Sequence, residues 1–203
     1  MTIQRLRNFV AEFTRLIAHD GADETRMHSE GEKLLLDIVR NDDWLPDEFA
    51  QPHPQYYQQY LLHCDPLERF SVVSFVWGPG QKTPLHDHTV WGILGVMRGA
   101  ELCNRYDAPT AGTPMRAHPQ ARLDLGQIDH VSPAVGDIHV VENAYADRVS
   151  ISVHVYGANI GAVKRHVYDA TTGIAKDFVS GYSNITMPNV WDRSAQVRAT
   201  LAK

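Results

Sequence analysis

The sequence of 203 residues has few cysteines and no long run of like charges. Its two cysteines, Cys64 and Cys103, are too few for a disulfide framework and form no CxxC pair. We therefore predict two reduced thiols in the core. With 19 basic and 24 acidic residues the net charge is -5, and the sequence offers no basic stretch to follow a phosphate backbone. Nucleic acid is thus not an expected partner.

Long apolar runs are also missing. In residues 1–20 charged side chains interrupt the apolar ones every few positions, which fits neither a secretory signal nor a membrane-spanning helix. We expect a cytoplasmic protein with no membrane partner. The length is sufficient for one well-buried core but short for two, so residues 1–203 are expected to form a single domain.

Two kinds of pattern divide the chain. Within residues 1–50, apolar residues recur at helical spacing twice, which predicts two amphipathic helices. Within residues 65–180, short runs rich in β-branched and aromatic residues alternate with Gly, Pro, Asp and Asn, and no helical pattern is long enough for parallel crossovers. This predicts a mainly β sandwich or barrel. The expected strands begin at Phe70, Trp91, Ala100, Asp137 and Ser150. Residues 181–203 are polar and are expected to wrap the surface or fray.

Histidines at two places suggest a metal site. In TPLHDHTVWG, His86 and His88 stand two apart, so on a strand both side chains leave the same face. Further on, GDIHVVEN places His139 between a glycine and Asn143. Imidazole is the commonest protein ligand for metals, so we predict that these three histidines hold one ion.

The frame around these histidines resembles the two motifs of the cupin superfamily. Gly80 precedes the HxH pair, Gly99 closes the expected hairpin that follows, and Gly136 precedes the third histidine. The resemblance implies a double-stranded β-helix, or jelly-roll, barrel behind N-terminal helices. The usual cupin glutamate after the HxH pair is missing, since residues 89–94 read TVWGIL. Three neutral ligands leave a divalent ion its full charge, which favours an anionic substrate such as a thiolate.

A third polar pattern lies in SISVHVY. Ser152, His154 and Tyr156 alternate with three aliphatic residues, so one strand face is polar and the other apolar. If the apolar face packs outside the barrel, the polar groups point inward and must find partners among themselves. The sequence therefore predicts a relay of serine, histidine and tyrosine inside the barrel.

Together with HDHT and the WGPG turn at residues 77–80, this strand resembles that of the thiol dioxygenases of the cysteine dioxygenase family. The resemblance implies an Fe(II) enzyme whose ion is held by His86, His88 and His139, with a small thiol and O2 as partners. Both oxygen atoms would pass to sulfur, giving a sulfinate. Tyr156 would orient oxygen or substrate, His154 would hold the Tyr156 hydroxyl, and Ser152 would fix the imidazole.

The substrate is predicted from one departure. Cysteine-specific members resemble this chain ahead of WGPG, but their carboxylate-binding arginine is matched here by Gln59, a neutral donor. Arg165 follows the Tyr156 strand and is expected to replace that arginine. The chain thus looks most similar to the bacterial branch that prefers 3-mercaptopropionate, with L-cysteine as a possible second substrate.

The same residues also fit two alternative functions. A cupin that senses a small acid without catalysis would not need iron, and three histidines with water also suit a zinc enzyme.

In mammalian-type members a cysteine shortly after HDHT is crosslinked to the tyrosine, whereas this chain has Gly92 and Ile93 there. We therefore predict an unmodified Tyr156.

Overall fold

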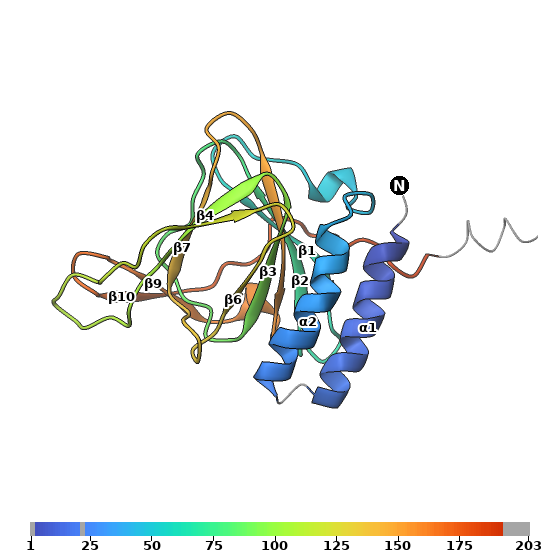
Figure 1. Cartoon of the computed structure of the whole chain (residues 1–203), viewed down its shortest axis with the longest axis horizontal. Coiled ribbons are helices and arrows are strands. Elements are labelled where there is room, and N and C mark those ends of the chain that lie inside the picture. Colours follow the sequence, from blue (N-terminus) through green and yellow to red (C-terminus); the bar gives the residue numbers. More distant parts are fainter. Residues whose placement is uncertain (1–2, 21–22, 193–203) are drawn as a thin grey trace, which may run out of the picture.

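The computed structural model describes residues 3–20 and 23–192, which form helices followed by two facing sheets (Figure 1). The predicted helices and strands are found close to their expected bounds. The helices are α1 (Gln4–Asp20), α2 (Glu24–Val39) and the short 3-10 segments η1 (Asp47–Phe49) and η2 (Ile160–Ala162). The strands are β1 (Gln58–Cys64), β2 (Ser71–Trp77), β3 (Gly92–Arg98), β4 (Ala100–Arg105), β5 (Ala121–Asp124), β6 (Ile128–Val131), β7 (His139–Asn143), β8 (Ser150–Tyr156), β9 (Arg165–Tyr168) and β10 (Ala175–Phe178).

The strands form the predicted cupin barrel. One sheet has the order β1-β2-β8-β3-β6, and the opposite side is built from β5-β4-β7 and the β9-β10 pair. The extended segment 82–87 connects these last two groups, because His86 bridges both His139 of β7 and Val167 of β9. The predicted double-stranded β-helix is therefore confirmed, and its interior is lined by side chains from both sheets.

The connection at Gly99 differs from the expected hairpin. Gly99 has a φ of +72°, and it connects β3 of the first sheet to β4 of the second rather than two paired strands. A side chain at this position would also collide with Ser150 on β8, since a Cβ would lie 2.3 Å from its Oγ. The hairpin prediction was wrong, and Gly99 instead turns the chain at a barrel corner.

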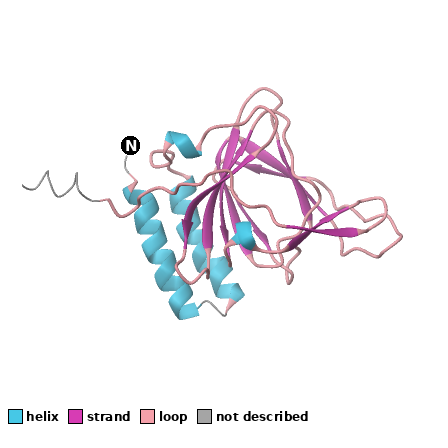
Figure 2. Cartoon of the chain, turned by 180° about the vertical axis from the view of Figure 1, so that it is seen from behind, coloured by secondary structure: helices cyan, strands magenta, loops and turns pink. Residues whose placement is uncertain are grey.

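Both helices cover the outer face of the five-stranded sheet (Figure 2). Asp23 caps α2 by accepting a hydrogen bond from the backbone N–H of Arg26 (3.1 Å). The apolar face of β8, made of Ile151, Val153 and Val155, packs in the same cluster as the buried residues of α1 and α2. The aliphatic side of this strand therefore faces the helices, which leaves its polar side for the barrel interior.

The ends of the barrel region differ in detail from the expected ranges. Strand β1 lies ahead of residue 65 yet pairs with β2, so the sheet begins before the predicted barrel range of residues 65–180. Within the predicted tail, Ser183 donates its backbone N–H to Gln59 O (2.8 Å), and the chain there follows the β1 edge. The rest of that tail, residues 193–203, lies outside the described residues. Among the residues described, no helix combines the length and the apolar character needed to cross a membrane.

Candidate metal centre and its polar surroundings

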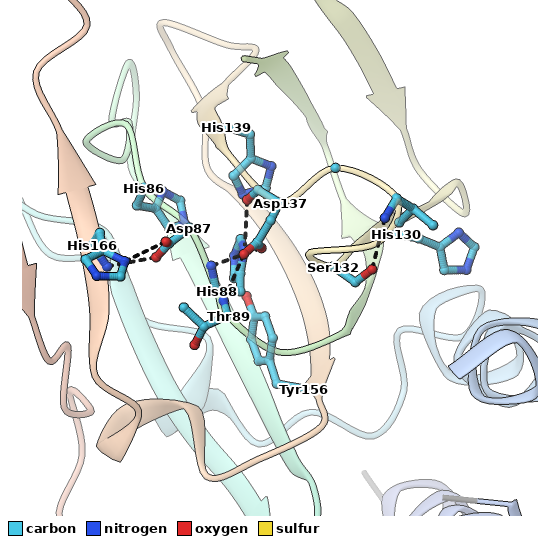
Figure 3. A network of polar contacts seen from close by, with 12 residues as sticks. His86, Asp87, His88, Thr89, His130, Ser132, Asp137, His139, Tyr156 and His166 are labelled. Carbon is cyan, nitrogen blue, oxygen red and sulfur yellow. Dashed lines mark hydrogen bonds and ion pairs between the residues drawn. The ribbon is translucent and has the colours of Figure 1, made fainter. Parts of the chain in front are cut away.

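Three histidines converge inside the barrel. His86, His88 and His139 each offer a ring nitrogen, and these nitrogens lie within 4.8 Å of one another. The ring centroids are 4.8 Å apart for the first two, and each lies 4.9 Å from the ring of His139. The structure thus brings all three predicted ligands into one buried cluster (Figure 3).

The HxH segment was predicted to lie on a regular strand, and the structure shows that it does not. His86 forms only isolated bridges, and His88 lies beyond them in an irregular stretch. The rings of His86 and His88 still reach the same point. Residue 86 exchanges two backbone hydrogen bonds with residue 139 (3.1 and 3.0 Å), and the backbone N–H of His88 donates to Asp137 Oδ1 (3.0 Å).

Each histidine has its Nδ1 engaged on the side away from the cluster. Nδ1 of His86 lies 3.0 Å from the carbonyl oxygen of Pro84, and Nδ1 of His88 lies 2.9 Å from Asp137 Oδ1. Nδ1 of His139 lies 3.5 Å from the sulfur of Cys103. When Nδ1 carries the proton in each such contact, the lone pair of the ring is on Nε2, the nitrogen left for an ion.

The electrostatics of the cluster suit a cation. Burial, and then the neighbouring histidines, hold the pKa of His86 and of His139 well below the usual value, so both rings are neutral at pH 7. Neutral imidazoles are the protonation state that binds metals. Three imidazole nitrogens in one buried cluster fit a divalent transition ion such as iron or zinc, so the residues present satisfy the predicted site.

Asp87, between the two ligands, fixes the segment from behind. Its carboxylate accepts hydrogen bonds from the backbone N–H of His166 (2.7 Å) and from the hydroxyl of Tyr168 (2.7 Å), and it pairs with the His166 ring (2.7 Å). Figure 3 shows Asp87 turned toward His166 and away from the three ligands. Strand β9 therefore holds the HxH segment in place.

Asp137 orients His88 and gives a first test of the cluster. Its carboxylate also accepts from the backbone N–H groups of His88 (3.0 Å) and Thr89 (2.9 Å). In Asp137→Asn we expect metal affinity to fall by about 10- to 100-fold, because the amide can present its NH2 to the ring and select the wrong tautomer. Titration of the apoprotein with ferrous iron measures this. Unchanged affinity would mean that Asp137 only supports the loop.

The predicted relay is present on β8. The hydroxyl of Ser152 lies 2.8 Å from Nε2 of His154, and Nδ1 of His154 lies 2.8 Å from the hydroxyl of Tyr156. The Tyr156 ring stacks on that of His88, with centroids 5.4 Å apart. Burial lowers the pKa of His154 and raises that of Tyr156, so the imidazole and the phenol are both neutral at pH 7. The relay therefore ends beside the metal ligands.

The surroundings of Tyr156 support the prediction that it is unmodified. Gly92 is its register partner on β3, and a Cβ there would lie 2.8 Å from the tyrosine ring. Both cysteines are free thiols: Cys103 is buried against His139, and Cys64, only half-buried at the end of β1, was wrongly placed in the core. Intact mass should therefore equal that of the unmodified chain, and a loss of two hydrogens would contradict this.

The two predicted substrate residues both contact Ser180, a residue that no sequence motif indicated. Arg165 donates to the hydroxyl of Ser180 (2.7 Å), and Gln59 donates through Nε2 to the same hydroxyl (3.2 Å) and to Gly181 O (3.0 Å). Arg165 is 4% exposed, packs over the Phe178 ring, and its Nε has no hydrogen-bond partner. It forms no ion pair with any described residue. Within the described part of the chain, no carboxylate makes an ion pair with this buried guanidinium, although the charges of Asp87 and Asp137 act on it and raise its pKa.

Several neighbours of the site were missed because single-sequence patterns do not show them. Asp137 stands two positions before His139, and Asp87 stands between His86 and His88, so their places in the two quoted motifs were the available signal. The other neighbours lie on strands or loops that only the fold brings to the site. They are Cys103 and Ser180, together with Trp77, whose indole N–H donates to Ser152 Oγ (3.3 Å), and Phe75, which stacks on His154.

A double-stranded β-helix with three converging histidines defines the class: the chain is a cupin with a candidate metal centre. Residues 39–169 match the family model for cysteine dioxygenase type I. The chain therefore belongs to the cysteine dioxygenase family, which confirms the family predicted from the sequence and implies a thiol dioxygenase.

Solved structures similar to this chain are more distant. An uncharacterized protein with a double-stranded β-helix domain from Klebsiella pneumoniae is 20% identical, with 60% of this chain and 94% of that one covered and a TM-score of 0.46. A Cupin 2 conserved barrel domain protein from Salinispora arenicola is 18% identical, with 57% and 86% covered and a TM-score of 0.41.

Proposed function

We propose that this cupin is an Fe(II)-dependent dioxygenase of small thiol carboxylates, with 3-mercaptopropionate as its preferred substrate and L-cysteine as a poorer one. The net reaction adds both atoms of O2 to the thiol sulfur and gives the sulfinate. The observation that carries the substrate assignment is Arg165, a buried guanidinium without a counterion among the described residues. A substrate carboxylate would supply that counterion.

His86, His88 and His139 would hold the ion through Nε2. A ferrous ion bound there would mediate electron transfer from the sulfur, which is oxidised, to O2, which is reduced, and its charge would favour the thiolate over the thiol. The protein orients the three rings by hydrogen bonds to Pro84 and Asp137 and by contact with Cys103. The site therefore needs little reorganisation to accept a cation.

Arg165 and Tyr156 would orient the substrate on two sides. The positive charge of the guanidinium acts against the burial effect on the pKa of Tyr156. The neutral Tyr156 hydroxyl is held by His154 and can donate or accept one further hydrogen bond. Arg165 would pair with the carboxylate, and Tyr156 would hold the oxygen or sulfur end.

Gln59 supports the choice of 3-mercaptopropionate. Both hydrogens of its amide are directed at Ser180 and Gly181. Gln59, which stands where cysteine-specific members have an arginine, therefore stabilises the side of the site formed by residues 180 and 181. Only Arg165 then remains to bind the carboxylate. A single anchor suits an unbranched thiol acid that has no amino group to place.

Oxygen uptake tests this proposal. Apoprotein loaded anaerobically with ferrous iron should consume one O2 per thiol oxidised, and the product should contain both atoms of labelled O2. The value of kcat/KM should favour 3-mercaptopropionate over L-cysteine by about 10-fold or more, which corresponds to about 1.4 kcal/mol. The matched control is the same apoprotein loaded with zinc, which has no redox chemistry and should be inactive. No uptake with either thiol would end the proposal, and a preference for cysteine would remove its substrate assignment.

A further inference from the structure

The chain that follows β10 packs against Arg165. Residues 178–184, which we call the C-terminal strap, run from the end of β10 to the edge strand β1. The Cζ atom of Arg165 lies 4.7 Å from the centre of the Phe178 ring, and Nη2 of Arg165 donates to the hydroxyl of Ser180 (2.7 Å). Two residues of the strap therefore hold a guanidinium that forms no ion pair with any described residue.

Strand β9 directs Arg165 toward the metal ligands. Val167 of this strand forms an antiparallel bridge with His86, so the side chains of these two residues leave the same face. Arg165 stands two positions before Val167 on the same strand, and its side chain therefore leaves that face as well. The positive charge of Arg165 acts on both His86 and Tyr156, which agrees with this placement. The guanidinium and its partner Ser180 thus lie beside the candidate metal centre.

The hydroxyl of Ser180 accepts two hydrogen bonds whose direction is fixed. Arg165 donates to it through Nη2 (2.7 Å), and a guanidinium can only donate. Gln59 donates to it through Nε2 (3.2 Å), and the same Nε2 donates to the carbonyl oxygen of Gly181 (3.0 Å), which sets the orientation of the amide. A hydroxyl group has two lone pairs and one hydrogen. Both lone pairs of Ser180 are therefore occupied, and its hydrogen is used by neither contact.

The remaining hydrogen of Ser180 suits a ligand that offers only acceptors. In the described part of the chain, the bonds of this hydroxyl are the two that it accepts. Ser180 is exposed, so a bound molecule can reach it. With its lone pairs occupied, the hydroxyl acts toward that molecule purely as a donor, next to the positive charge of Arg165. A carboxylate has two acceptor oxygens and a negative charge, and it therefore matches this pair of donors.

We propose that Ser180 is a substrate-binding residue whose hydroxyl donates to the same carboxylate that pairs with Arg165. This role rests on the proposed function, since the ligand is the thiol carboxylate assigned there. Arg165 stays the only charged anchor of the carboxylate, and Ser180 adds a neutral donor beside it. Gln59 acts indirectly, because its amide occupies the second lone pair of Ser180 and leaves the hydroxyl as a donor. A thiol without a carboxylate gains nothing from this contact.

Anaerobic titration of the ferrous protein with 3-mercaptopropionate measures this contact without turnover. In Ser180→Ala we expect the dissociation constant to rise by about 10- to 100-fold, as for the loss of a hydrogen bond to a charged acceptor. For 2-mercaptoethanol, which has no carboxylate, it should change by less than about threefold. Ser180→Thr keeps the hydroxyl and should bind both thiols as the wild type does. Wild-type affinity for 3-mercaptopropionate in Ser180→Ala would overturn the proposal, and so would a loss in Ser180→Thr as large as that in Ser180→Ala.

Ser183→Ala is the matched control for a purely structural effect of the strap. Ser183 lies on the same strap and accepts a hydrogen bond from the backbone N–H of Gln59 (2.9 Å), but it does not bond to Arg165. This variant should keep both dissociation constants. An equal loss in the two alanine variants, or an equal loss for both thiols in Ser180→Ala, would show that the strap only supports the fold. If the wild type binds 3-mercaptopropionate but oxidises neither thiol, the proposed activity fails, while the affinities still decide the role of Ser180.

Discussion

Replacing His139 with alanine is expected to reduce bound iron to below about 1% and thiol oxidation with it. Even residues that only orient a ligand are worth about 10- to 100-fold in metal affinity, so losing one of three direct ligands must cost at least that much. His139 is the only one of the three that comes from the second motif, and its ring lies 4.9 Å from both others. Without it the remaining pair has no third donor among the described residues of the cluster.

The measurement is iron content after loading and desalting, together with initial oxygen uptake. His118→Ala is the matched control, because His118 is half-exposed and contacts only Asp107 at the surface (2.7 Å). It should retain wild-type iron and rate. The backbone hydrogen bonds between residues 139 and 86 do not need the ring, so the fold should survive in His139→Ala. Stoichiometric iron in that variant would show that the three histidines are not the metal site.

The second large effect is expected at Arg165. In Arg165→Met, kcat/KM for 3-mercaptopropionate should fall by about 30- to 3000-fold, because truncating one partner of a buried charged pair costs about 2 to 5 kcal/mol. With 2-mercaptoethanol, which has no carboxylate, the rate should change by less than about threefold. The free energy of unfolding should not decrease, since the variant removes a buried charge that burial already penalises, as the lowered pKa of Arg165 shows.

Comparison of the two thiols separates substrate binding from a structural role. Lys164→Met provides the control, because Lys164 is the adjacent cation but is exposed and paired with Asp177 (2.6 Å). It should leave both rates unchanged. Arg165→Lys should recover only part of the loss, since an ammonium group lacks the planar fork that matches a carboxylate. An equal loss with both thiols would mean that Arg165 only stabilises the barrel.

Local sequence was sufficient for the fold class and for selecting the three histidines that converge in the barrel. Strand periodicity placed β2, β3, β4, β7 and β8, and the alternation in β8 correctly assigned its polar side to the interior. These predictions succeeded because side-chain direction along a strand depends only on neighbouring residues. The local geometry predicted for the HxH motif was wrong, since His86 forms only isolated bridges and His88 lies beyond them in an irregular stretch.

Partners from distant strands could not be predicted from the sequence. Gly99 was expected to close a hairpin, but whether a turn joins paired strands or crosses between sheets depends on which strands lie next to each other in the barrel. In the same way, nothing near Trp77 in the sequence indicates that its indole N–H donates to Ser152 on β8. These contacts join residues more than twenty positions apart, so only closure of the barrel creates them.

The sequence by itself determined the class of protein, the three histidines and the serine, histidine and tyrosine of β8, because each is written in a short motif with fixed spacing. Tertiary structure decided how these groups are held: which nitrogen each imidazole leaves free, that Arg165 is buried with no ion pair among the described residues, and that the Trp77 indole donates to the serine of the relay. Protonation and hydrogen-bond direction depend on burial and on partners from other strands, and a linear motif specifies neither.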